Sequence, residues 1–261
     1  MKNKSPYYRV KSVEKALKIL EVISEKGEAS LTELSQALKL TKTNIHRLVL
    51  TLAENGFVIR SRGGSKYMLS LRLFALAGSV NQRSTLVHIA LPKLQKLSTL
   101  SSETINLGVL YNDKVLYLHK IVSNEYLRLD TPIANSDPAY ATALGKCLLS
   151  SLDRDDLDSY IQRNIPFKAL TRNTIKDPLK LIWKLEETRR NEYVLDIGEW
   201  LEGVNCIASL IKDEDGKGVA AISITGPSVR MTEEKIRKLK EPLLRAVKEV
   251  SKDFKRLSAT H

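Results

Sequence analysis

Short polar side chains interrupt the apolar segments of the C-terminal half, and their chemistry would suit a small ligand. Ser223 and Thr225 are two residues apart in an otherwise apolar segment, so on a strand they share one face. Cys206 opens the preceding apolar segment, and Asp196 ends another. Gly145 lies in a helical pattern, where glycine costs about 1 kcal/mol relative to alanine, so close approach of a backbone or a ligand is needed to explain it. Hydroxyls, a thiol and a carboxylate around a glycine predict a site for a small hydroxylated acid.

Each of these residues also has a purely structural interpretation. Cys206 is compatible with a small buried hydrophobic residue, and Asp196 with a strand-end cap or a surface acid. Ser223 and Thr225 are compatible with ordinary sheet positions, and Gly145 with close packing of a helix. A helix that begins just after Pro138 would add a free N-terminus able to hold a carboxylate.

Two other functions compete with ligand binding. Cys206, His119 and Asp196 are the residue types that a thiol hydrolase uses as nucleophile, base and orienting acid. The chain has only 4 histidines and no G-x-S-x-G motif, so this alternative has little support. A redox sensor would use Cys206 or Cys147, but only Cys147 has an adjacent basic residue in the sequence. We therefore expect a binding protein and not an enzyme.

A second constellation, in the N-terminal quarter, predicts contact with DNA. Residues 31–38 and 41–55 each show the apolar spacing of an amphipathic helix, with a turn at 39–40 and Thr41 as the N-cap of the second helix. The opposite face of that second helix is polar and basic. A helix of this kind enters the major groove and contacts bases near its N-terminal end. The candidate DNA-contacting residues of this helix are Lys42, Thr43, Asn44, His46 and Arg47.

A basic hairpin follows this helix. Residues 57–60 and 66–69 fit two short strands, and the glycine-rich segment 61–65 fits the loop between them. Such a wing would contact phosphates or the minor groove through Arg60, Arg62 and Lys66. The alternative is a helical hairpin that mediates protein interaction and binds no DNA, with His46 as a solvated helix residue.

The distribution of charge agrees with DNA binding at the N-terminus. The 261 residues contain 42 Lys and Arg against 30 Asp and Glu, a net charge of +12. Residues 1–70 contain 13 Lys and Arg against 6 Asp and Glu, a net charge of +7, so the first quarter holds over half of the excess.

The hydrophobic pattern predicts two domains joined by a helix: residues 1–70, a linker helix over 71–83, and residues 84–261. In the first domain we expect Ser12 to cap a helix whose Val13, Ala16, Leu17 and Leu20 face inward and which ends at Gly27. For the second domain we expect strands over 104–110, 114–121 and 127–129, helices over 139–152, 153–163 and 179–191, strands over 193–197, 205–211 and 219–225, and a helix over 232–254. This order is typical of an α+β fold with an antiparallel sheet flanked by helices.

Other classes of protein are disfavoured. Two cysteines, Cys147 and Cys206, form no zinc or disulfide pattern, and no metal or cofactor is expected. The N-terminal segment has no apolar signal core, and no apolar run approaches the ~20 residues of a membrane span. A cytoplasmic location is the simplest expectation.

The chain resembles the IclR family of bacterial transcriptional regulators over nearly its whole length, roughly residues 11–254. The segments that carry the resemblance are 12–17, 31–34 and 41–55 in the N-terminal part and 138–146, 196–199, 203–208 and 222–227 in the C-terminal part. Segments 103–108 and 116–121 are also similar to regulators that sense keto-deoxy sugar acids from pectin breakdown.

This resemblance implies a winged helix-turn-helix, a linker helix and a GAF-like α/β effector domain. It implies homodimers that often pair into homotetramers, and repression or activation of catabolic operons; we favour a repressor. The effector, a small organic or sugar acid, would be bound by residues that match Gly145, Asp196, Cys206, Ser223 and Thr225.

Overall fold

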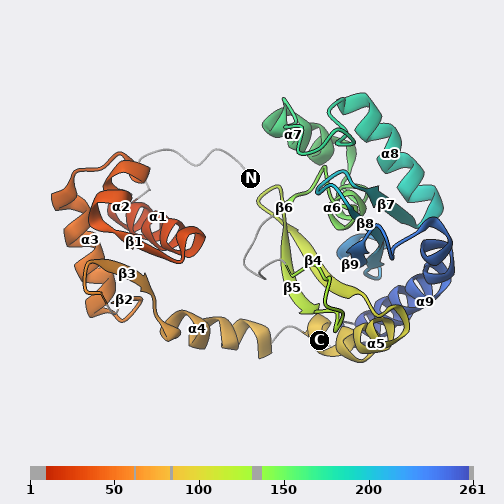
Figure 1. Cartoon of the computed structure of the whole chain (residues 1–261), viewed down its shortest axis with the longest axis horizontal. Coiled ribbons are helices and arrows are strands. Elements are labelled where there is room, and N and C mark those ends of the chain that lie inside the picture. The colour runs from red at the N-terminus through yellow and green to blue at the C-terminus, as the bar shows by residue number, and fades with distance from the viewer. Residues whose placement is uncertain (1–9, 62, 83–84, 131–136, 259–261) are drawn as a thin grey trace. The chain divides into compact units, whose positions relative to one another are not determined.

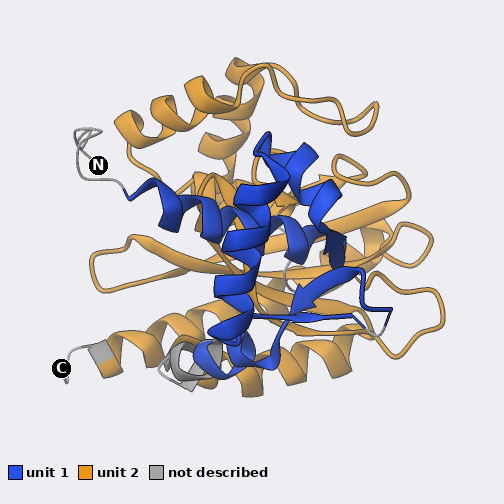
Figure 2. Cartoon of the chain, turned by 90° about the vertical axis from the view of Figure 1, so that its left-hand side faces the viewer, with its two compact units in different colours: residues 1–83 blue, residues 84–261 orange. Residues whose placement is uncertain are grey.

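The computed structural model describes residues 10–61, 63–82, 85–130 and 137–258 (Figure 1). The chain divides into two compact units, residues 1–83 and 84–261, which Figure 2 distinguishes by colour.

The first unit is a small helical domain with a three-stranded sheet. Its elements are α1 (Lys11–Lys26), β1 (Glu28–Ser30), α2 (Leu31–Leu38), α3 (Lys42–Glu54), β2 (Val58–Arg60), β3 (Lys66–Leu69) and α4 (Leu71–Gln82). The strands follow the order β1-β3-β2, with antiparallel pairs. Ile19 and Ile23 of α1, Leu34 of α2, and Ile45 and Val49 of α3 are fully buried and form the core that holds the helices together.

Local signals in the sequence fix the two central helices. Ser30 caps α2 through a capping box, because its hydroxyl accepts from the Glu33 N–H while the Glu33 carboxylate accepts from the Ser30 N–H. Lys39 adopts a left-handed conformation, with φ of 52°, and ends α2. Thr41 caps α3 by accepting from the Asn44 N–H, as its type and position predict.

The start and the inner face of α1 differ from our expectation. The helix begins at Lys11 after Val10, without a side-chain cap, so Ser12 is a helical residue. Val13 and Leu17 are 56% and 55% exposed, so their predicted inward position is wrong, and Ile19 and Ile23 are the fully buried residues. Ala16 and Leu20 pack against the core as predicted. The predicted end of the helix at Gly27 is confirmed, with φ of 76°.

The second unit is built on a six-stranded antiparallel sheet with helices on both faces. Its elements are α5 (Thr85–Ser101), β4 (Thr104–Tyr111), β5 (Lys114–Ile121), β6 (Asp137–Pro138), α6 (Ala143–Leu149), α7 (Arg154–Asn164), α8 (Pro178–Asn191), β7 (Tyr193–Ile197), β8 (Val204–Lys212), β9 (Gly218–Pro227) and α9 (Glu233–Ser258). The strand order is β6-β5-β4-β9-β8-β7. The predicted fold class, α+β with an antiparallel sheet, is confirmed.

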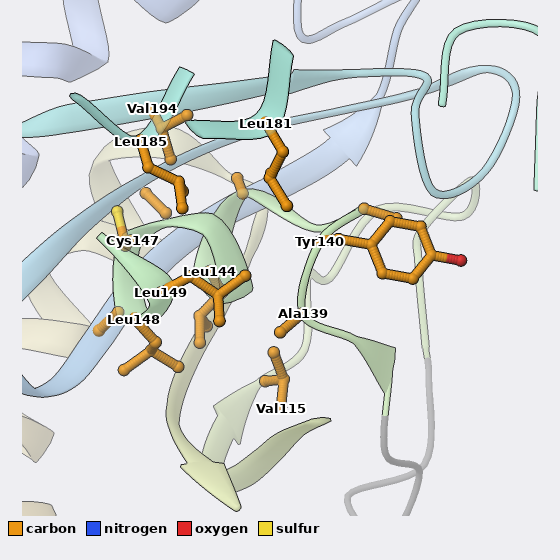
Figure 3. Close-up of a cluster of buried hydrophobic side chains, with 14 of the residues drawn as sticks. Val115, Ala139, Tyr140, Leu144, Cys147, Leu148, Leu149, Leu181, Leu185 and Val194 are labelled. Carbon is orange, nitrogen blue, oxygen red and sulfur yellow. The ribbon is translucent and has the colours of Figure 1, made fainter. Parts of the chain in front are cut away.

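Alternation along the strands separates two cores. Ile207 of β8 with Ile222 and Ile224 of β9 pack against α5 and α9. Residues of the opposite parity, such as Ala208 and Ala221, face α6, α7 and α8. Figure 3 shows part of this second core, in which helix α6 is buried along its whole length.

The positions of two elements of this unit differ from the prediction. Residues 127–129 are not a strand, and the third strand is β6. The expected helix over 139–152 begins only at Ala143, because Thr142 caps it by accepting from the Gly145 N–H. The free helix N-terminus expected after Pro138 is therefore absent, and Gly145 lies in the first turn of α6.

Candidate functional site

Helix α3 presents a polar surface on the first unit. Its buried residues are Ile45, Val49 and Leu52. The candidate DNA-contacting residues are all exposed on its other sides: Lys42, Thr43, Asn44, His46 and Arg47. Asn44 and Arg47 also border a groove between α1 and α3. The sequence pattern therefore separates the buried and exposed faces of this helix correctly.

Two basic side chains of the wing hairpin interact with other residues of the first unit. The Arg60 guanidinium lies 5.6 Å from the centre of the Tyr67 ring. Lys66 Nζ lies 3.0 Å from the Glu28 carboxylate, and this ion pair links β3 to β1. Arg62, the third basic residue predicted here, lies outside the described residues. In the wing, the Arg60 guanidinium therefore packs on the Tyr67 ring, whereas the Lys66 ammonium group forms an ion pair with Glu28.

In the second unit, the register of the sheet brings the predicted polar residues together. Asp196 of β7 pairs with Cys206 of β8, and Cys206 pairs with Thr225 of β9. Ser223, two residues before Thr225, pairs with Asn106 of β4. Directly paired residues share a sheet face. All five side chains therefore lie on the face that α6 covers.

Asn106 forms the centre of this polar group. Its Nδ2 donates to Ser223 Oγ at 3.2 Å and to Thr225 Oγ1 at 3.4 Å. Its Oδ1 is buried and, among the described residues, has no hydrogen-bond partner. The residue is only 5% exposed, so bulk water does not satisfy this acceptor. An unpaired buried amide oxygen is costly, and a ligand that donates a hydrogen bond would remove the cost.

These side chains enclose a small cavity of about 20 Å³. Its lining residues are Asn106, Tyr117, Leu129, Thr142, Ala143, Leu144, Asp196, Trp200, Cys206, Ser223 and Thr225. The volume suffices for about one water molecule. A larger ligand must displace lining side chains, and Leu129 and Trp200 are partly exposed. Four of the five predicted effector residues line the cavity.

Gly145, the fifth, does not line it. A Cβ built on Gly145 would lie 2.3 Å from the carbonyl oxygen of Ala139. Close approach of another backbone, one of the two reasons that the sequence suggested for this glycine, therefore explains it. The contact fixes the start of α6, and so the positions of Thr142 and Leu144 in the cavity wall.

A buried set of charges borders the cavity. Lys146 is fully buried; its Nζ donates to Leu195 O at 3.0 Å and also to Glu199 Oε1. Asp196 Oδ1 accepts from the Glu199 N–H at 2.7 Å. Burial raises the pKa of Asp196 to about 6, although the Lys146 charge opposes the shift. The Asp196 side chain in the cavity is therefore mostly ionised at neutral pH and becomes protonated as the pH falls through about 6.

Neither thiol has the surroundings of a nucleophile. Burial raises the pKa of Cys206 well above its usual range, and the nearby Asp196 carboxylate adds to the shift. Burial also raises the pKa of Cys147 to about 12. His119 pairs with Leu107, whose side chain packs on the opposite face of the sheet from Cys206. The geometry supports neither the hydrolase nor the redox sensor.

Sequence patterns did not identify the whole cavity wall. Asn106, Tyr117 and Trp200 were not predicted, because their contribution depends on pairing of β4 with β5 and β9 and on a loop after β7. Within the described ranges, no group of three or more His, Cys, Asp or Glu is arranged to hold a metal ion. No helix among those residues is long and apolar enough to cross a membrane.

Both units of the chain match models of known protein families. The model of the IclR helix-turn-helix domain matches residues 12–62, and that of the bacterial transcriptional regulator IclR C-terminal domain matches residues 78–252. The HTH-type transcriptional regulator KdgR of Escherichia coli (strain K12) is 35% identical over 242 residues, which cover 93% of this chain and 92% of that protein. The acetate operon repressor of Salmonella typhimurium is 33% identical, covering 93% of this chain and 89% of that protein.

A solved structure extends the similarity to three dimensions. An IclR homolog from Microbacterium hydrocarbonoxydans, complexed with 4-hydroxybenzoate, superposes with a TM-score of 0.78 at 25% identity. The match covers 93% of this chain and 97% of that chain. The chain therefore belongs to the IclR family of bacterial transcriptional regulators.

Proposed function

We propose that this protein is a repressor whose operator binding is controlled by a small organic acid bound in the cavity of the second unit. The observation that carries the effector proposal is the unpaired Oδ1 of Asn106 in a small polar cavity beneath α6. A resident polar ligand would pair this atom. The acetate operon repressor, a relative by sequence, supports the choice of repression.

The cavity favours an acid that also has hydroxyl or keto groups. Hydroxyls of the effector would donate to Asn106 Oδ1, while Ser223 and Thr225 would donate to its oxygens. Asp196, with its raised pKa, would take up a proton as an effector carboxylate enters, which removes the repulsion between two negative charges. Because the chain resembles regulators that sense keto-deoxy sugar acids, these acids are the first effectors to test.

DNA contact is proposed for the exposed residues of α3 and for the wing. The contacting side chains would be Lys42, Thr43, Asn44, His46 and Arg47 on the helix and Arg60, Arg62 and Lys66 on the wing. Lys66 would exchange its partner Glu28 for a phosphate. Two half-sites on one face of the duplex, a whole number of ~10 bp turns apart, would match a symmetric dimer.

Homodimers, which pair into homotetramers, are part of the same proposal. Leu71 and Phe74 at the start of α4 are 84% and 78% exposed, and Val13 and Leu17 of α1 are also exposed. Large apolar side chains in such positions are typical of surfaces that associate with another subunit. We propose that α1 and α4 contribute to the dimer interface.

The test combines thermal stability with operator binding. A ligand that binds only the native state raises the melting temperature of the purified protein by mass action. We expect a sugar or keto acid to do so, and to release operator DNA in a gel-shift assay. Ser223→Ala should lose both effects, whereas Ser159→Ala, an exposed serine of α7, should keep them. Equal responses in the two variants, or no response to any acid, would refute the proposed pocket.

A further inference from the structure

A second cavity in the second unit is much larger than the effector cavity. It is a groove of about 730 Å³ lined by residues from the C-terminal end of α6, helix α8, strand β8 and the second half of α9. Figure 1 labels these four elements in the second unit. We call it the α8–α9 groove. It shares no lining residue with the effector cavity. Its volume lies within the range of sites that bind small molecules.

The walls of the α8–α9 groove are strongly basic. The six cations that line it are Arg189, Lys212, Lys248, Lys252, Lys255 and Arg256. Glu192 is the one carboxylate among the lining residues. The turn between β8 and β9 contains Asp213, Glu214 and Asp215, but only its Gly216 belongs to the lining. A ligand in the groove would therefore meet a positive potential, which favours an anion.

Some of these cations have structural roles. Arg189 donates to the carbonyl oxygens of Ser150 at 2.6 Å and Leu152 at 2.9 Å, which it caps beyond the end of α6. Lys212 and Lys248 both lie 3.6 Å from the Glu192 carboxylate. These contacts explain half of the cations without any ligand.

Of the other three cations, Arg256 also has an interaction within the chain, and Lys252 and Lys255 form no ion pair among the described residues. They are three residues apart on α9, so they lie on the same side of the helix. Within the part of the chain that the structure describes, neither ammonium group has a carboxylate partner within ion-pair distance. Ser251, next to Lys252, accepts a hydrogen bond from the Lys212 N–H at 3.1 Å, so its own hydroxyl proton can be donated to a ligand.

The remaining lining is apolar. Leu152, Leu210, Leu244 and Val247 contribute to the groove, and the first two are only partly buried. An apolar surface beside two ammonium groups and a hydroxyl matches a ligand with an apolar body and a doubly charged head. Phosphate has the acceptor oxygens for three such donors.

We propose that the α8–α9 groove binds an amphipathic organic phosphate, with its head on Lys252, Lys255 and Ser251 and its body on the leucines of the floor. The site is separate from the effector cavity, and its occupation does not depend on the proposed repressor function.

Calorimetry on the full chain with three probes tests this. The probes are 1-naphthyl phosphate, inorganic phosphate and 1-naphthol. We expect one 1-naphthyl phosphate per chain, bound at least about tenfold more tightly than either partial probe, because only it uses both the cations and the apolar floor. Its affinity should also fall as salt is added. Equal binding of inorganic phosphate would overturn the proposal, because it would indicate an unspecific ion.

Charge reversal locates the site. Lys252→Glu with Lys255→Glu should weaken 1-naphthyl phosphate binding at least about tenfold, since two attractive charges become repulsive. Arg245→Glu is the matched control, because Arg245 is an exposed residue of α9 that does not line the groove. Ser223→Ala should leave this binding unchanged while it abolishes the effector response. Binding that survives the double reversal, or falls equally in Arg245→Glu, would refute the assignment.

Discussion

Replacing Asp196 by asparagine should stabilise the protein at high pH, although the residue lines the proposed effector site. Asp196 is 1% exposed, and burial raises its pKa from 3.8 to about 6. An acid with a raised pKa binds a proton more readily in the folded state than in the unfolded one. Between these pH values the folded state therefore holds the extra proton, and stability falls as the pH rises.

The size of the effect follows from the shift. At about 1.4 kcal/mol for each pH unit, ionisation of Asp196 costs the folded state about 3 kcal/mol above pH 6 and about 1 kcal/mol at pH 4.5. Asparagine has the same shape and keeps an oxygen that accepts from the Glu199 N–H. It lacks the charge, so it avoids this cost. The attraction of Lys146 for the Asp196 carboxylate is already included in the shifted pKa, so it is part of the cost of about 3 kcal/mol. Any change in packing caused by the amide is independent of the ionisation of residue 196.

The assay is urea denaturation of the wild type and Asp196→Asn at pH 4.5 and pH 8. At each pH, the free energy of unfolding of the wild type is subtracted from that of the variant. This difference should be about 2 kcal/mol larger at pH 8 than at pH 4.5. Comparison of the two pH values cancels the constant contributions. A difference that is the same at both, or that favours the wild type more at pH 8, would refute the buried-acid argument. It would not affect the family assignment.

Three further substitutions test the helix start, the DNA surface and the capping box. Gly145→Ala should destabilise the second unit by at least about 2 kcal/mol in denaturation experiments, because its Cβ meets the Ala139 backbone; a neutral effect would show that the backbone yields easily. Arg47→Ala should lower operator affinity by at least about tenfold in gel-shift assays and leave effector binding intact; normal operator affinity would exclude it as a base contact. Ser30→Ala should cost the first unit about 1 kcal/mol, seen as a lower unfolding midpoint, and an unchanged midpoint would mean that the capping box with Glu33 adds nothing.

The sequence predicted those parts of the structure that depend on local pattern. Helix α3, its cap at Thr41 and the hairpin of β8 and β9 follow from spacing and residue type within a few neighbours. The predicted start of α1 was wrong. Ser12 is a good N-cap by residue type, but the helix already includes Lys11.

Long-range pairing set the limit of prediction. Leu127 and Leu129 flank a basic residue in a strand-like alternation, but a strand needs a partner, and the edge of β5 pairs with Asp137 and Pro138 instead. Asn106 was missed for the same reason. Ser223 and Thr225, to which its amide donates hydrogen bonds, are over a hundred positions away in the sequence, so no local pattern predicts that contact.

The alternating register of β7, β8 and β9 links ligand specificity to the fidelity of folding. Asp196, Cys206 and Thr225 meet because three strands pair without a shift at these positions. A slip of one residue in either pairing would turn every polar group of that strand toward α5 and α9. It would also bring isoleucines such as Ile207 and Ile224 into the cavity. A chain that misregisters here loses its core and its ligand together, so any molecule stable enough to persist has its binding groups correctly placed.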